Sequence, residues 1–272
     1  MPLSGSPSHF LRVLCGEAVM NLHVKVAGSG PDLVLVHGWG MSAGVWDDTA
    51  AQLAQQFRVH SVELPGHESP ACAPYTLDAV AAALADICAP RATVCGWSLG
   101  GQIALRWSFM HPEQVERLVL IASTPRFVRG SDWNNGMDVA VFDAFAQDLA
   151  HDAQGALQRF AMLQAHGDAD ARNVSRRLRA CLSVRGAGDV ASLAAGLQIL
   201  RDTDLRADLP RIAQPALIVH GERDTVVPLA AGEYLERTLP QATLAVIAGA
   251  AHAPFVTQPQ DVARRITEFC RG

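Results

Sequence analysis

Short apolar runs that end at glycine or proline recur along the chain, and a stretch with helical spacing follows most of them. The runs lie at residues 33–36, 59–64, 92–95, 118–121, 216–219 and 244–247. Uninterrupted apolar strands are expected where helices cover both faces of a sheet. Helical segments alternate with these runs, for example at residues 77–88, 102–111 and 232–238. The alternation predicts βαβ units and therefore a mostly parallel sheet flanked by helices.

Residues 125–208 interrupt this alternation, because one helical pattern follows another there without a convincing strand. A helical insertion between two strands of an open α/β sheet would lie over the strand ends, where such sheets bind ligands. We therefore predict a helical cap at residues 125–208. The core would then consist of residues 1–124 and 209–272.

The composition excludes several classes of protein. Of the 272 residues, 49% are hydrophobic and 18% are charged, which suits one globular unit with a sizeable core. No apolar stretch is long enough to span a bilayer, and the patch at residues 10–15 is too short for a signal peptide, so we expect a cytoplasmic protein. The net charge of −5 argues against nucleic acid as a partner. Six scattered cysteines without ligand spacing predict free thiols and no zinc site. The sequence also has no Walker motif, Rossmann fingerprint or metal-ligand cluster, so we expect no cofactor.

The segment Gly96-Trp97-Ser98-Leu99-Gly100 directly follows an apolar strand and directly precedes a helical pattern. This is the context of a nucleophile elbow, in which a tight turn holds a serine above the sheet at a helix N-terminus. The flanking glycines remove side chains that would collide with the backbone nearby. We predict that Ser98 is a nucleophile. The alternative is an ordinary glycine-rich connection whose serine caps the helix.

A serine hydroxyl needs a base, and His252 is the best candidate because it follows the last predicted strand. Two carboxylates follow the strand before it. Asp224 is the candidate acid that would fix the imidazole tautomer, because the chain turns into a helix directly after it, and Glu222 is its competitor. The order serine, acid, histidine is the one found in α/β hydrolases. The remaining histidines that we considered fit structural or solvated positions better: His37, His111, His151, His166 and His220.

Acyl transfer also needs donors for an oxyanion. One should be the backbone N–H of Leu99, directly after the nucleophile, and the other that of Trp39, in the loop after the first apolar run. The ring of Trp39 would either line the acyl site or serve as plain packing. The nucleophile, acid, base and oxyanion donors follow one another along the chain in the order that is typical of the α/β-hydrolase fold. Together they predict hydrolysis of an ester, thioester or amide through an acyl-enzyme.

Several further segments narrow the resemblance. They are residues 35–40 (LVHGWG), 96–101 (GWSLGG), 111–113 (HPE) with 118–123 (LVLIAS), 196–200 (GLQIL) with 204–206 (DLR), and 250–255 (AAHAPF). From about Asn21 onward the chain resembles the pimeloyl-acyl carrier protein methyl ester esterases of biotin synthesis. The resemblance implies that the substrate is the methyl ester of a pimeloyl chain bound to acyl carrier protein. It also implies a substrate channel formed by Trp39, Ser98, Leu99, Phe160, Ala161, Met162, Leu163 and Gln164, and arginines of the cap, Arg159 among them, that hold the acidic carrier.

A cluster of arginines gives a separate reason to expect a carrier protein. Five arginines and no acidic residue lie between positions 172 and 185: Arg172, Arg176, Arg177, Arg179 and Arg185. On a helix, Arg172, Arg176 and Arg179 share one face. A compact positive stripe on a net-negative protein suits the docking of an acidic carrier protein. The alternative is a solvated face whose arginines pair with Asp168 and Asp170.

Two other functions remain compatible with these residues. A general carboxylesterase for short acyl esters would use the same three catalytic groups behind a different cap. A non-catalytic hydrolase-fold protein that binds a small ligand is the alternative from another class. In each case we expect a monomer.

Overall fold

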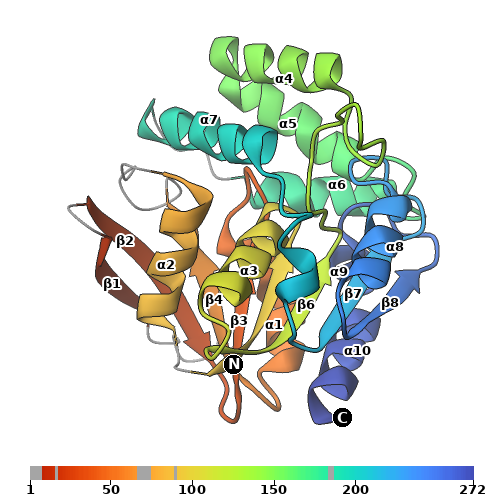
Figure 1. Cartoon of the computed structure of the whole chain (residues 1–272). Coiled ribbons are helices and arrows are strands. Elements are labelled where there is room, and N and C mark those ends of the chain that lie inside the picture. The colour runs from red at the N-terminus through yellow and green to blue at the C-terminus, as the bar shows by residue number, and fades with distance from the viewer. Residues whose placement is uncertain (1–7, 16–17, 66–74, 89–90, 183–186) are drawn as a thin grey trace.

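The computed structural model describes residues 8–15, 18–65, 75–88, 91–182 and 187–272. Its centre is an eight-stranded sheet with the order β1-β2-β4-β3-β5-β6-β7-β8 (Figure 1). The strands are β1 (Ser8–Cys15), β2 (Ala18–Ala27), β3 (Asp32–Val36), β4 (Arg58–Glu63), β5 (Ala92–Trp97), β6 (Val115–Ile121), β7 (Ala216–Gly221) and β8 (Ala242–Ile247). Pairing is antiparallel from β1 to β2 and from β2 to β4, and parallel between all other neighbours. The predicted mostly parallel sheet is confirmed, and the six apolar runs coincide with β3 to β8.

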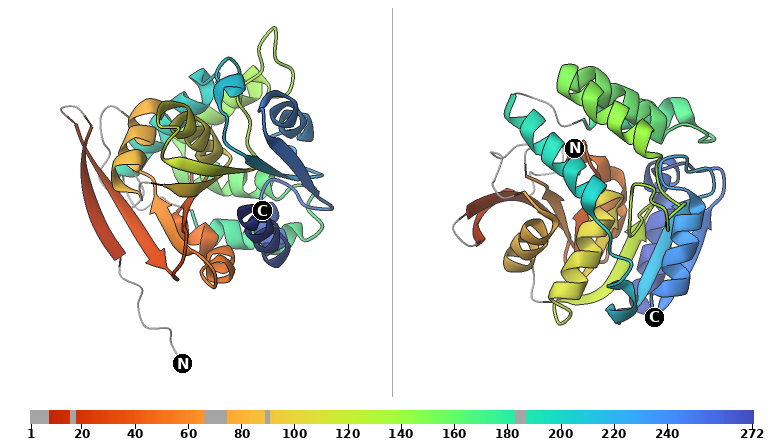
Figure 2. Two further views of the ribbon diagram at one scale, coloured as in Figure 1. Left: turned by 60° about the horizontal axis from the view of Figure 1, so that its bottom comes forward. Right: turned by 45° about the horizontal axis from the view of Figure 1, so that its top comes forward.

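Two hydrophobic cores form because alternate side chains of the central strands point to opposite faces of the sheet. In β3, Val34 and Val36 join one core, and Leu33 and Leu35 join the other; none of the four is exposed. The first core is covered by α2 (Leu77–Ile87), α3 (Leu99–Met110) and α8 (Leu229–Thr238), and the second by α1 (Asp47–Leu53), α9 (Pro254–Thr257) and α10 (Pro259–Arg271) (Figure 2). Burial on both faces explains why these strands consist of continuous apolar runs.

The strands β1 and β2 lie in a part of the chain where the sequence analysis predicts no strand. They form the antiparallel edge of the sheet, and β2 also pairs with β4. Along β2, the buried Leu22 and Val24 alternate with the less buried His23 and Lys25. A half-buried antiparallel strand has this period of two, so a search for continuous apolar runs does not detect it.

Between β6 and β7, the described residues form four α-helices and then a short 3-10 helix (Leu209–Arg211). The α-helices are α4 (Val139–His151), α5 (Ala153–Gln164), α6 (Ala171–Ala180) and α7 (Ala187–Asp202). In Figure 1, α4, α5 and α7 lie above the sheet, on the side to which the inserted segment rises after β6. The beginning and the end of the segment meet, because the N–H of Leu205 donates to the carbonyl of Pro125 at 2.9 Å.

The beginning of this segment is not helical, although the sequence analysis predicts helices throughout. Residues 125–138 form a loop closed by isolated bridges, Val128 to Met137 and Gly130 to Trp133. The loop needs glycine at position 136: a Cβ there would lie 2.6 Å from the carbonyl oxygen of Phe127. The two chain segments therefore approach each other more closely than any other residue would allow.

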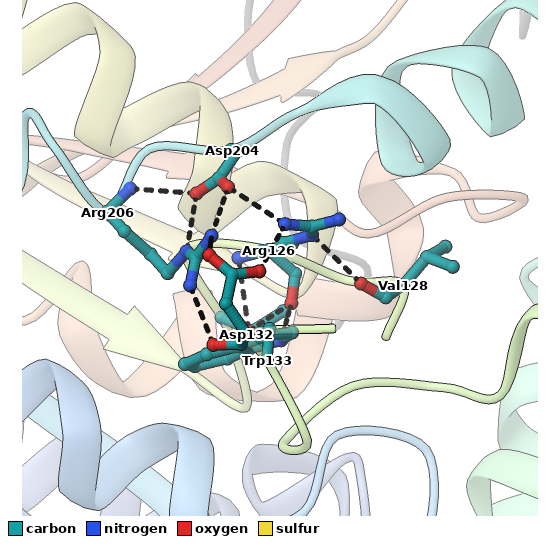
Figure 3. A network of polar contacts seen from close by, with 7 residues as sticks. Arg126, Val128, Asp132, Trp133, Asp204 and Arg206 are labelled. Carbon is teal, nitrogen blue, oxygen red and sulfur yellow. Dashed lines mark hydrogen bonds and ion pairs between the residues drawn. The ribbon is translucent and has the colours of Figure 1, made fainter. Parts of the chain in front are cut away.

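Two arginines and two aspartates connect this loop to the chain that leaves the segment (Figure 3). The guanidinium of Arg206 donates to Asp132 and Asp204 at 2.7 Å each, and that of Arg126 contacts Asp204 at 3.1 Å. The hydrogen bonds from Arg206 hold the pKa of both aspartates below the usual value. Arg206 also stacks over the ring of Trp133, with 5.5 Å between the guanidinium carbon and the ring centroid. The two ends of the inserted segment are therefore fastened together where they join the core.

Candidate active site

Ser98 lies in the tight turn between β5 and α3. Its backbone has φ 54° and ψ −115°, a conformation that non-glycine residues rarely adopt and that costs of order 1–3 kcal/mol. The surroundings hold it there: the N–H of Ser98 donates to the carbonyl of Ile121, and the hydroxyl of Ser123 donates to the carbonyl of Ser98, both at 2.9 Å. The turn places Ser98 at the N-terminus of α3, where the helix dipole favours negative charge.

Two glycines make this turn possible, because the backbone passes so closely that no side chain fits. A Cβ on Gly96 would lie 2.1 Å from the carbonyl oxygen of Gly100, and a Cβ on Gly100 would lie 2.2 Å from that of Val36. The second contact joins the start of α3 to the end of β3. It therefore brings the loop after β3 next to the turn of Ser98.

A buried hydrogen bond joins His252 to Asp224. Nδ1 of His252 lies 2.8 Å from Oδ2 of Asp224, and the exposed fractions of the two side chains are 1% and 0%. The other carboxylate oxygen accepts from the N–H groups of Val226 and Val227 at 2.9 Å each. Because an ionised carboxylate only accepts, Nδ1 carries the proton, and Nε2 of the neutral imidazole is left as the acceptor. This Nε2 is buried and makes no hydrogen bond within the part of the chain that the structure describes.

Trp97 connects His252 to the turn of Ser98. Its indole Nε1 donates to the backbone carbonyl of His252 at 2.8 Å, and the centroids of the indole and imidazole rings are 5.6 Å apart. Trp97 directly precedes Ser98 and is completely buried. The structure therefore brings the three residues that the sequence analysis selected to one end of β5, and their catalytic roles stay predictions.

The competing carboxylate, Glu222, is directed elsewhere. It is half-exposed and accepts from the N–H of Gly249 at 2.9 Å. His220 lies behind the site: it is fully buried, its Nε2 donates to the carbonyl of Val227 at 2.9 Å, and the same Nε2 is 3.5 Å from Oδ2 of Asp224. Burial lowers the pKa of His220, so it is neutral near pH 7 and a structural partner of the acid.

The loop after β3 is ordered by His37. Nε2 of this buried imidazole accepts from the N–H of Leu64 at 3.0 Å, which leaves Nδ1 to donate to the carbonyl of Gly38 at 2.8 Å. Leu99 is the first residue of α3, so its N–H has no acceptor within the helix. The roles of the N–H groups of Trp39 and Leu99 as oxyanion donors stay predictions.

The side chain of Trp39 reaches into the inserted segment. Its Nε1 donates to the carbonyl of Leu193 in α7 at 2.8 Å. Its ring packs edge to face against Phe145 and Phe160, with centroid distances of 5.4 and 5.3 Å. Beside these rings lies a small cavity of about 100 Å³, lined by Trp39, Phe127, Met137, Val141, Phe142, Phe145, Phe160, Leu163, Leu197 and Leu200. All of these side chains are apolar, so the cavity suits an aliphatic chain.

The five residues of α5 that were predicted to line the substrate channel lie in different surroundings. Phe160 and Leu163 line the cavity. Met162 is 48% exposed, and Ala161 is buried in the core on the other side of the helix. Gln164 is buried, and its carbonyl accepts from the N–H of His252 at 3.2 Å, so it supports the loop of the histidine.

The sequence analysis missed the lining residues of α4 and α7. Phe142 and Phe145 are spaced for one face of a helix, as are Leu197 and Leu200. This spacing indicates a buried face, but it gives no information about what the face contacts.

Comparison with known proteins decides the family. The model of the α/β hydrolase fold family matches residues 31–259. A pimeloyl-[acyl-carrier protein] methyl ester esterase from Nitrosomonas europaea is 43% identical over 241 residues, which cover 88% of this chain and 96% of the relative. One from Aromatoleum aromaticum is 44% identical over 248 residues, which cover 89% and 99%. This chain belongs to the pimeloyl-[acyl-carrier protein] methyl ester esterase family of α/β hydrolases.

A solved structure supports the same fold. An esterase from Exiguobacterium antarcticum matches with a TM-score of 0.84 at 24% identity, covering 93% of this chain and 96% of that chain. The predicted fold and the predicted family are therefore both confirmed. Within the described residues, this α/β hydrolase has no group of three or more histidine, cysteine, aspartate or glutamate side chains that could hold a metal ion. No helix in the described part of the chain is long and apolar enough to cross a membrane.

The arginines of α6 are partly free in this α/β hydrolase. Arg172, Arg176 and Arg179 are exposed, and within the described residues their side chains make one hydrogen bond, from Arg176 to Asn173 at 2.6 Å. None of the three forms an ion pair with a carboxylate of the described residues. In particular they do not pair with Asp168, which is buried.

The other arginines that the sequence analysis named differ from these three. Arg177 is held by Asp48 and by the carbonyl of Val256. Arg159, on α5, donates to Asp148 at 3.1 Å. Arg185 lies outside the described residues. The exposed stripe on α6 therefore consists of Arg172, Arg176 and Arg179.

Proposed function

We propose that this protein is a serine carboxylesterase that hydrolyses the methyl ester of pimeloyl-acyl carrier protein in biotin synthesis. The observation that carries the chemistry is the buried hydrogen bond from His252 to Asp224, tied through Trp97 to the strained turn of Ser98. With Nδ1 bonded to Asp224, Nε2 of His252 is left to accept a proton, which is what a general base must do.

In the first half of the reaction, Oγ of Ser98 attacks the ester carbonyl carbon while Nε2 of His252 takes the hydroxyl proton. The N–H groups of Leu99 and Trp39 stabilise the oxyanion, and Asp224 stabilises the imidazolium that forms. When the C–O bond to the methoxy group breaks, His252 returns the proton to it and methanol leaves. The pimeloyl chain is then bound to Ser98 as an ester.

In the second half, a water molecule gives its proton to Nε2 of His252 and its oxygen to the acyl carbon. The same donors hold the second oxyanion. Collapse of this intermediate breaks the bond to Ser98, which regains its proton from His252. The product leaves with a free carboxylate, and the thioester that joins it to the carrier is not touched.

The substrate class rests on the relatives and on two features of the inserted segment. Relatives at 43% and 44% identity bear the name of this esterase. The apolar cavity beside Trp39 suits the methylene chain of a pimeloyl group. The stripe of Arg172, Arg176 and Arg179 suits an acidic carrier protein. We accordingly propose that residues 125–208 act as a cap, over a core of residues 1–124 and 209–272.

The deciding experiment compares hydrolysis of pimeloyl-acyl carrier protein methyl ester with that of a small aryl butyrate, with Ser98→Ala as the control. We expect a higher kcat/KM for the carrier-bound ester, and loss of both activities in Ser98→Ala. Rapid turnover of the aryl ester with an inert carrier substrate would instead identify a general carboxylesterase. Full activity of Ser98→Ala would contradict the catalytic assignment itself.

A further inference from the structure

Asp168 is a buried carboxylate whose partners are hydrogen-bond donors rather than a cation. It lies between α5 and α6 in the inserted segment, and 8% of its surface is exposed. Oδ2 accepts from the N–H of Ala251 at 2.9 Å and from the hydroxyl of Thr257 at 2.7 Å, and Oδ1 accepts from the N–H of Asp170 at 2.9 Å. Ala251 directly precedes His252, and Thr257 ends α9, which follows His252. One carboxylate therefore holds the loop of His252 from both sides.

Two backbone hydrogen bonds lie beside this contact. The N–H of Ala169 donates to the carbonyl of Gly249 at 2.8 Å, and the N–H of His252 donates to the carbonyl of Gln164 at 3.2 Å. The turn from Gln164 to Ala169 thus runs alongside the histidine loop. These two hydrogen bonds join backbone groups, so a substitution does not remove them. The hydrogen bonds to the carboxylate of Asp168 can be removed by changing its side chain.

The orientation of His252 depends on this loop, because the imidazole is fixed by its backbone as well as by Asp224. Ala251 and His252 are buried, and without Asp168 the N–H of Ala251 would lack an acceptor. A loop that rearranges to satisfy this N–H would move the imidazole relative to Ser98. A displacement of one ångström at a catalytic group lowers the rate steeply.

We infer that Asp168 is a positioning residue, which fixes the loop of His252 to the inserted segment and so keeps Nε2 aligned for proton transfer. The inference rests on the proposed function, because it takes His252 as the base. It assigns to the inserted segment a part in catalysis in addition to covering the site. Asp168 touches neither the substrate nor the reacting atoms, so its removal should lower kcat without weakening substrate binding.

The test uses the full-length protein with a small aryl butyrate, whose binding does not involve a carrier. Asp168→Asn keeps the size of the side chain but replaces one acceptor oxygen with an NH₂ group, which then faces a donor. We expect kcat to fall roughly 10-fold or more while KM stays within about twofold. Asp170→Asn is the matched control: the same substitution, two residues along the same turn, at an exposed side chain without a hydrogen bond in the described structure. It should leave kcat unchanged.

A second pair of variants covers the case in which Asp168→Asn does not fold. Thr257→Val removes the hydroxyl that donates to Asp168 at nearly constant volume, and it should lower kcat in the same direction. Thr257→Ser keeps the hydroxyl and should restore most of the lost kcat. Values of kcat in Asp168→Asn and Thr257→Val equal to that of Asp170→Asn would overturn the inference, as would a rise in KM that accounts for the whole loss. Failure of the proposed function is distinguishable, since it would show as an active Ser98→Ala protein.

Discussion

The indole of Trp97 donates a hydrogen bond of 2.8 Å to the backbone carbonyl of His252. The two residues are far apart in the sequence, and the bond links the strand end that carries Ser98 to the loop that carries the proposed base. Through it, a fully buried side chain connects the proposed nucleophile to the loop of the proposed base. We therefore expect Trp97 to influence the geometry between Ser98 and His252.

Trp97→Phe should consequently lower activity as well as stability. The substitution keeps an aromatic ring but leaves the carbonyl of His252 without its donor, at a cost of about 1–3 kcal/mol in the free energy of unfolding. We expect kcat to fall roughly 10-fold because the imidazole loses one of its anchors. Trp107→Phe provides the comparison. Trp107 lies on α3 and is equally buried, and its Nε1 donates to Gln114 at 3.0 Å. It should lose similar stability in urea unfolding and keep its kcat; equal losses of kcat in both variants would argue against a specific role for Trp97.

Asp224→Asn should abolish most of the activity without unfolding the protein. The amide oxygen can still accept from Val226 and Val227, so the NH₂ group would face Nδ1 of His252. The imidazole would then carry its proton on Nε2 and could not act as a base, and we expect kcat to fall about 10⁴-fold. Glu222→Gln changes the competing carboxylate and should retain kcat. The reverse result would transfer the role of the acid to Glu222.

The stripe of Arg172, Arg176 and Arg179 should affect the carrier-bound substrate alone. Replacing all three by glutamine is expected to raise KM for the carrier-bound ester roughly 10-fold and to reduce its dependence on salt, because steering by surface charge is screened by ions. Kinetics with a small aryl ester should not change. Arg177→Gln, on the same helix but paired with Asp48, should leave KM for the carrier-bound ester unchanged. An unchanged KM in the triple variant would mean that the stripe is only a solvated surface.

His220 should make stability depend on pH. Burial lowers its pKa in the folded state, so the unfolded chain binds the proton more tightly. Above the pKa of histidine in the unfolded chain, about 6.5, His220 is neutral in both states and the protein keeps its full stability. As the pH falls below that value, the unfolded chain takes up the proton first and the free energy of unfolding decreases. Urea unfolding between pH 7.5 and about pH 5 should show a smaller loss for His220→Gln than for the unaltered protein. Parallel curves for the two proteins would show that another group is responsible.

The parts of this fold that could be predicted are those in which local sequence and environment agree. Strands such as β3 and β5 are buried on both faces, and that burial leaves an apolar run that can be recognised without a structure. The elbow at Ser98 is local in part: Gly96 is required by the backbone of Gly100, within the turn, whereas Gly100 is required by the backbone of Val36, which lies in β3.

What could not be predicted depends on contacts between distant segments. The family resemblance placed five consecutive residues of α5 in the substrate channel, yet consecutive residues of a helix point in different directions. Phe160 and Leu163 share the face toward the cavity, whereas Met162 lies about 200° around the helix from Phe160 and is exposed. Asp168 was considered only as a partner for arginines, because nothing in its sequence neighbourhood indicates that it reaches Ala251.

The fastening of the inserted segment at its base has a consequence for how such enzymes diversify. Leu205 bonds to Pro125, and the pairs among Arg126, Asp132, Asp204 and Arg206 hold the two chain crossings together. A segment whose ends already meet can be lengthened, shortened or exchanged while β6 and β7 remain adjacent in the sheet. If residues 125–208 act as the proposed cap, exchanging this segment should change substrate preference while the sheet stays intact, provided that the replacement again supplies an acceptor for the N–H of Ala251.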